Sequence, residues 1–241
     1  MTKQIFPLAL GGLAIGTTEF IIMGLLPDVA KDLGVSIPIA GHLISAYAFG
    51  VVVGAPILVA LSSKFPPKNI LIVYMILFTL FNALSIVAPD YNTLLMSRFL
   101  AGLPHGAFFG VGTIVAIKLS KKGKEAQAVS SMFTGLTLAI LLLVPLLTYI
   151  GHNTSYKWAF LIVSLLGIFT ILALLKFMPK LKSLKTVTFK EEIEFFLTFK
   201  AWHIILIVAI GFGGLFAWFS YIAPLLINIS KFPPSSISYL M

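Results

Sequence analysis

Two ionisable side chains lie within long apolar stretches of the sequence: Glu19 in GTTEFIIMG and Arg98 in LLMSRFLAG. A guanidinium keeps its proton, whereas a carboxyl group can gain and lose one. A charge inside a membrane costs at least ~2.5–3.5 kcal/mol, so it needs a polar partner and commonly has a function. We therefore predict that Glu19 and Arg98 carry proton coupling. The alternatives are a permanent ion pair that only fixes helix packing and, for Arg98, a side chain that reaches the headgroups.

The residues after Arg98 place further groups on one face of a helix. At ~3.6 residues per turn, His105 and Phe109 lie on the same side as Arg98. Pro104 removes a backbone donor and is expected to bend this helix. Glycines recur at every fourth position and would allow a neighbouring backbone to approach closely. They are Gly102, Gly106 and Gly110.

Other stretches supply candidates for lining, gating and loop contacts. Gly50 and Gly54 in GVVVGAP are expected at a helix–helix contact, and Pro145 is a further candidate for helix packing or gating. Lys64 and Lys68 lie in a short basic link, LSSKFPPKN, and are expected to face the cytoplasm. Asn82 is either an interhelical hydrogen-bond donor or a satisfied core amide. Four residues are candidates for lining a substrate site, although rings within spans also serve packing: Phe20, His105, Phe108 and Phe109.

Composition places the chain in a bilayer. Hydrophobic residues make up 59% of the 241 positions and charged residues 10%, against roughly 25% charged residues in soluble domains. The strand alternation of a membrane barrel is absent, so we predict an all-α membrane protein. Seven apolar runs are long enough to span a membrane: about 5–27, 38–61, 69–88, 93–117, 127–150, 157–178 and 202–227.

The distribution of lysines predicts the orientation and argues against several function classes. Most of the sixteen lysines fall in segments that lie on the inside if the N-terminus is cytoplasmic. They form no continuous basic face, so no nucleic-acid partner is predicted. The sequence has no cysteine, and its four histidines show no metal-ligand spacing. We predict no metal, no cofactor and no enzymatic activity, because no nucleophile–base pair is apparent either.

Three regions follow from the loop lengths. Residues 1–178 are predicted to form a six-helix bundle, residues 179–200 a cytoplasmic connector, and residues 201–241 span 7 with the start of span 8. Within the connector, acidic residues alternate with apolar ones from 191 to 199, which suggests a short amphipathic helix at the interface. This layout indicates that a second bundle begins after the connector.

Three segments together resemble the major facilitator superfamily, in particular its drug/proton antiporter branch with the arabinose efflux permeases. They are EFIIMGLLPDVAKDLGVSIPIAGHLISAYAFGVVVGAP (19–56), RFLAGLPHGAFFGVGTIVA (98–116) and GLFAWFSYIAPLL (214–226). The resemblance implies that Arg98 with Gly102 takes part in proton coupling, and that Glu19 is the acidic residue of the first span. The chain departs from the pattern of this branch at Leu143 and Leu147, where glycines usually lie on either side of the span-5 proline.

The resemblance also implies two six-helix halves, so the chain is expected to be a fragment that ends in the eighth span. We predict a proton-coupled efflux permease of the bacterial inner membrane, multi-pass, for a sugar or small amphipathic compound. Its expected partners are substrate, protons, lipid and a missing C-terminal half. The alternative is a non-transporting truncated membrane protein or a regulatory partner of an intact transporter.

Overall fold

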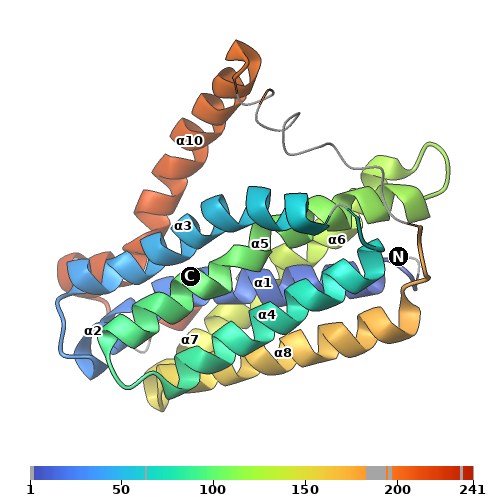
Figure 1. The fold of residues 1–241 in the computed structure, drawn as a ribbon. Coiled ribbons are helices and arrows are strands. Elements are labelled where there is room, and N and C mark those ends of the chain that lie inside the picture. Colours follow the sequence, from blue (N-terminus) through green and yellow to red (C-terminus); the bar gives the residue numbers. More distant parts are fainter. Residues whose placement is uncertain (1–2, 63, 183–193, 195–196, 234–235, 241) are drawn as a thin grey trace.

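The computed structural model describes residues 3–62, 64–182, 194, 197–233 and 236–240. Six membrane-length segments of this chain lie side by side as a bundle (Figure 1). They are α1 (Phe6–Gly24), α3 (Ile37–Ser62), α4 (Pro67–Val87), α5 (Tyr91–Leu119), α6 (Glu125–Leu138) continued by η1 (Ala139–Leu143) and α7 (Val144–Asn153), and α8 (Tyr156–Phe177). The short helix α2 (Leu26–Asp32) joins α1 to α3.

A seventh membrane-length helix, α10 (Phe199–Ser220), runs obliquely away from the bundle (Figure 1). It is followed by α11 (Ile222–Pro224), η2 (Leu225–Ile229) and α12 (Ile237–Leu240). The seven predicted spans are therefore confirmed in the part of the chain that the structure describes. The protein is an all-helical, multi-pass membrane protein.

Two predicted boundaries need correction. The first run, expected to continue to residue 27, is interrupted because α1 ends at Gly24 and α2 begins at Leu26, next to Pro27. The seventh, expected over 202–227, begins three residues earlier and ends at Ser220. A proline near the start of a helix is compatible with helical backbone: Pro27 lies in the first turn of α2, and Pro224 ends α11 and directly precedes η2. The amphipathic helix expected around 191–199 falls largely outside the described residues.

Local sequence explains where the long helices begin. Asp90 precedes α5, and its carboxylate accepts a hydrogen bond from the Thr93 amide at 2.9 Å. This bond holds the pKa of Asp90 below its usual value. Pro67 occupies the first turn of α4, where no backbone donor is needed. In the continuous segment α6–η1–α7, the π-helical turn η1 ends just before Pro145. The missing amide of Pro145 interrupts the α-helical hydrogen-bond ladder there.

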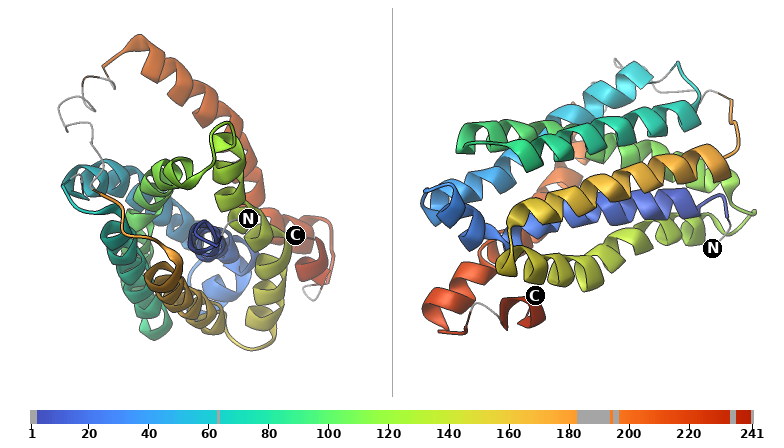
Figure 2. Two further views of the ribbon diagram at one scale, coloured as in Figure 1. Left: turned by 90° about the vertical axis from the view of Figure 1, so that its right-hand side faces the viewer. Right: turned by 90° about the horizontal axis from the view of Figure 1, so that it is seen from below.

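α1 lies among the other bundle helices, as the view along the bundle shows (Figure 2, left). It contacts α6 and α8 most extensively and also touches α3, α5 and α7. Glycines make this possible, since a Cβ on Gly12 would lie 2.9 Å from the carbonyl O of Met132 in α6, and one on Gly16 would lie 3.0 Å from the Ala139 side chain. Helix α1 therefore positions Thr18 and Glu19 at the centre of the bundle.

Candidate functional site

The guanidinium of Arg98 lies inside the bundle and is hydrogen-bonded to α1. The side chain of Arg98 is 0% exposed. Its Nη1 donates to the hydroxyl oxygen of Thr18 at 3.0 Å, and its Nη2 donates to the carbonyl oxygen of the same residue at 3.0 Å. Two parallel bonds suit the fixed fork of a guanidinium. The alternative in which Arg98 extends to the headgroups is therefore wrong.

The polar contact continues from Thr18 to a third helix. The Thr18 hydroxyl donates to Oδ1 of Asn82 at 2.5 Å, and Nδ2 of Asn82 donates to the carbonyl oxygen of Phe78 at 2.8 Å. Asn82 is thus an interhelical partner, as an acceptor, and at the same time a satisfied core amide. Arg98 of α5, Thr18 of α1 and Asn82 of α4 form one fully buried hydrogen-bond chain. In a medium without water such a chain fixes how the three helices are rotated about their axes.

Two aromatic rings complete the surroundings of the cation. The guanidinium carbon of Arg98 lies 4.3 Å from the ring centroid of Tyr47 in α3 and 5.7 Å from that of Phe160 in α8. The Tyr47 hydroxyl is also 3.0 Å from Nδ1 of His105, one of the predicted lining residues. Tyr47 therefore links Arg98 to His105. We did not predict a role for Tyr47, although it lies one turn before Gly50, on a helix for which the glycines already predicted a close helix–helix contact.

Glu19, the residue after Thr18, lies beside this cluster and is only partly buried. Asp28 and His152 lie 3.0 Å apart, whereas no salt bridge joins Glu19 to Arg98 in the described part of the chain. The Nε atom of Arg98 is buried and has no hydrogen-bond partner. The cation is thus held through Thr18 and two rings, while the permanent ion pair of the packing alternative is not observed. A role of Glu19 in proton coupling stays a prediction.

The predicted glycines lie where α3 and α5 touch, with one difference. A Cβ on Gly50 or Gly54 would overlap the carbonyl oxygens of Phe99 and Leu103 in α5, respectively. On the other helix, a Cβ on Gly102 would overlap the Tyr47 carbonyl oxygen, and one on Gly106 would lie 2.8 Å from Ala55. Gly110 was expected to extend this ridge, but nothing lies within 4 Å of its Cβ position. The close contact ends at Gly106.

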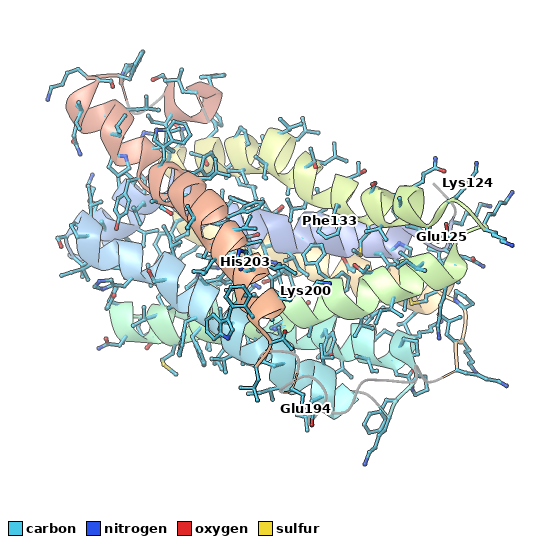
Figure 3. All side chains as sticks on the ribbon, turned by 90° about the horizontal axis from the view of Figure 1, so that it is seen from above. Lys124, Glu125, Phe133, Glu194, Lys200 and His203 are labelled. Carbon is cyan, nitrogen blue, oxygen red and sulfur yellow. The ribbon has the colours of Figure 1, made fainter. Side chains whose placement is uncertain are left out.

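The four lining candidates occupy three different surroundings. His105 and Phe109 adjoin each other, with ring centroids 5.3 Å apart, and Phe109 stacks on Phe133 of α6 at 5.0 Å. Phe133 was missed by the sequence analysis and is exposed (Figure 3). Phe108 is fully buried, and its ring occupies the space that a Cβ on Gly11 would need, so it packs in the core. Phe20 lies away from this group, with its ring 5.5 Å from that of Phe216 in α10.

The remaining predicted residues lie nearer the bundle ends or surface. Nζ of Lys68 donates to the carbonyl oxygens of Leu175 at 2.8 Å and Met178 at 2.7 Å, and so caps the end of α8. Lys64 is exposed in the link before α4. Pro145 faces a shallow apolar cavity beside Tyr149. Among the described residues, no group of three acidic or histidine side chains could hold a metal ion.

Comparison with protein families gives one match over nearly the whole chain. Residues 8–241 fit the model of the major facilitator superfamily. The inner membrane transport protein YdhP of Escherichia coli is 42% identical over 97% of this chain and 60% of its own length. A probable sugar efflux transporter of Helicobacter pylori is 31% identical over 96% of this chain and 59% of its own. The chain therefore spans about 60% of the length of the curated relatives it matches.

Solved structures show the same fold at low sequence identity. An inward-facing bacterial homologue of the human lysosomal transporter Spinster superposes with a TM-score of 0.76 and 15% identity, covering 97% of this chain and 57% of that one. A D-xylose–proton symporter superposes with a TM-score of 0.66 and 16% identity, over 98% of this chain and 64% of the symporter. At this identity the likeness describes the arrangement of helices.

Proposed function

The chain belongs to the major facilitator superfamily, and on this premise we propose that it exports a sugar or small amphipathic compound in exchange for protons. The observation that carries the proposal is the buried Arg98, which is held by Thr18 and carries no ion pair within the described residues. A permanent charge at the centre of a membrane bundle is costly to insert. Packing alone would be served as well by an apolar residue, so the charge is better explained by a function.

Glu19 is the proposed proton carrier. Glu19 follows Thr18 directly, so a change of charge on its carboxyl group acts on the turn of α1 to which Arg98 is hydrogen-bonded. A protonated Glu19 is neutral and leaves the Arg98 cation unbalanced, whereas an ionised one balances it at short range. The two states would favour different positions of α1 against α5. Such a two-state element is what couples a proton to a conformational change.

The α3–α5 contact is the proposed place for the accompanying movement. Gly50, Gly54 and Gly102 bring the two backbones together without interlocking side chains, so sliding requires little repacking. In the proposed cycle, residues 1–178 act as one rocking bundle, 179–200 as connector, and 201–241 as the start of the opposing bundle. The lysine distribution supports a cytoplasmic N-terminus in a bacterial inner membrane.

The substrate class is proposed from one relative and from the rings. The Helicobacter pylori relative is named a probable sugar efflux transporter, and His105, Phe109 and Phe133 present a polar group beside stacked rings. An aromatic surface with a few polar groups suits a small molecule with one apolar face. The Phe133 ring is the exposed member of this set.

The test is transport by the full-length protein in proteoliposomes with an imposed pH gradient. Glu19→Gln keeps size and hydrogen bonding but cannot ionise. We expect it to abolish pH-driven transport while substrate counterflow persists. Asp32→Asn is the matched control, because it makes the same change outside the spans and should leave both activities intact.

Three results would contradict the proposal. Unchanged pH-driven transport in Glu19→Gln would remove Glu19 as the proton carrier. Loss of folded protein in the same variant would make Glu19 architectural, since a buried charge left unpaired costs ~3–5 kcal/mol in soluble proteins. Absence of any transport by the unaltered protein would favour the non-transporting alternative.

A further inference from the structure

A small cavity lies at the end of the bundle where α1 begins, well away from Arg98. Its volume is about 220 Å³, and it is formed where α5 ends, α6 begins and the chain enters α1. Hydroxyl, amide and ammonium groups line it together with two apolar side chains: Ser120, Lys121, Lys124, Gln127, Ser131, Ile5 and Ala128. It is smaller than the ~300–1,000 Å³ typical of drug-sized ligands. A compact polar group would fit it better than a whole substrate.

The charges around the cavity are unbalanced in favour of cations. Neither Lys121 nor Lys124 forms an ion pair with any residue that the structure describes. The nearest acid in the sequence, Glu125, is already engaged, because its Oε1 accepts a hydrogen bond from the Gly123 amide at 3.1 Å. Figure 3 labels Lys124 and Glu125 at this end of the bundle, where α6 begins. The cavity therefore presents donors that lack an anionic partner within the described chain.

The first turn of α6 adds to this field. No side chain caps its N-terminus, where Lys124 occupies the N-cap position. The first amides of a helix have no intrahelical acceptors and carry a partial positive charge. Gln127 belongs to this turn and also lines the cavity. Lysine side chains, hydroxyl groups and an uncapped helix start together form a donor set suited to phosphate.

We infer that this cavity binds a phosphate group, carried by the headgroup of an anionic phospholipid or by free phosphate. The position supports a lipid source, because the cavity lies at the ends of two membrane-length segments, α5 and the segment α6–η1–α7, where headgroups are found. Anionic lipids gather on the cytoplasmic leaflet, which is the side that the lysine distribution predicts for this end. The bound group would connect the α5–α6 link to the start of α1.

The first test compares two variants that lose the same charge. Lys121→Gln with Lys124→Gln alters the cavity, whereas Lys118→Gln with Lys122→Gln alters lysines of the same segment that do not line it. Each protein is taken from nanodiscs of phosphatidylglycerol and phosphatidylcholine, and retained phosphatidylglycerol is measured by native mass spectrometry. We expect retention to fall about thirtyfold in the cavity variant, as two lysines at ~1 kcal/mol each imply. The control should change severalfold less. Equal losses in both variants would overturn the proposal.

The second test identifies the source of the phosphate without altering the protein. Lysines are labelled with an amine-reactive reagent in phosphatidylcholine nanodiscs, in the same nanodiscs with millimolar inorganic phosphate, and in phosphatidylglycerol nanodiscs. Selective protection of Lys121 and Lys124 by phosphatidylglycerol alone supports a headgroup site, and equal protection by inorganic phosphate supports a free-anion site. Lys118 and Lys122 serve as internal controls. If neither probe protects the cavity lysines more than the control lysines, no phosphate is recognised there and the proposal fails.

Discussion

Helices α1 and α10 are both long, apolar and glycine-containing, yet only α1 is packed inside the six-helix bundle. In α1, 14 of 19 residues are buried, whereas in α10 only Ala201 and Ser220 of 22 residues are. Gly11, Gly12 and Gly16 in α1 lie against side chains or backbone of α5 and α6. The glycines of α10 meet nothing within 4 Å: Gly211, Gly213 and Gly214.

Hydropathy alone does not separate the helix packed inside this six-helix bundle from the helix that lies outside it. The more apolar of the two is α10, and it is the exposed one. Lipid tails are as apolar as leucine, so an apolar face gains little by turning inward. The inner helix is instead the one with polar side chains that need partners, as Thr18 does with Arg98 and Asn82. Glycine contributes only where such a helix already has a close neighbour.

The largest expected effect is therefore a methyl group added at the α1 contact. Gly135 of α6 faces α1, and a Cβ there would overlap the Ala9 carbonyl oxygen. Since backbone cannot rotate away as a side chain can, Gly135→Ala should destabilise the protein by about 3 kcal/mol or more. Thermal unfolding in detergent would measure this.

The matched change in α10 is Gly213→Ala, which meets open space. It should be neutral or slightly stabilising, because alanine is the better helix former by roughly 1 kcal/mol. If the two substitutions proved equally harmful, the difference in packing between α1 and α10 would not hold in the folded protein.

A smaller effect is expected from the polar contact itself. Arg98→Lys keeps the charge but loses the planar fork, so lysine cannot reproduce both bonds to Thr18 or the position over the Tyr47 ring. Losing one charge-assisted bond should cost about 2 kcal/mol in unfolding free energy. The reverse exchange in α10, Lys200→Arg, affects an exposed residue and should leave stability unchanged. A stable Arg98→Lys protein would mean that charge alone, without geometry, holds α1.

The sequence was sufficient to place the spans and the buried charge, because both follow from local properties. An apolar run of about twenty residues can hardly avoid forming a membrane helix. An arginine several residues inside such a run must be sheltered by the protein. The spacing of Gly50, Gly54, Gly102 and Gly106 likewise indicated a close contact. It could not show that Gly110 lies beyond it, since that depends on the angle at which α3 and α5 cross.

The partners of Arg98 could not be predicted in the same way. Thr18 is 80 positions away in sequence, and it was overlooked beside the more conspicuous Glu19. Hydroxyl groups in membrane helices usually bond to the preceding turn, as Thr17 does to the Leu13 carbonyl oxygen. Which of two adjacent threonines turns outward to a neighbour is decided by the rotation of α1. A one-residue difference of that kind, about 100° around the helix, is not encoded in hydropathy or spacing.

The smallest expected effect concerns a ring contact between α1 and α10. Phe20 of α1 contacts Phe216 and Phe219 of α10, with ring centroids 5.5 and 5.8 Å away. Ring pairs of this kind contribute ~0.5–1.5 kcal/mol beyond area burial. Phe216→Ala should therefore weaken the attachment of α10 by about 1 kcal/mol without unfolding the bundle. Spin labels on α1 and α10 would show this as a broader distance distribution.

Phe212→Ala, at a ring that is 59% exposed, is the control and should leave that distribution unchanged. Similar broadening in both variants would mean that α10 is held along its length, and α1 and α10 would then differ less than their burial indicates.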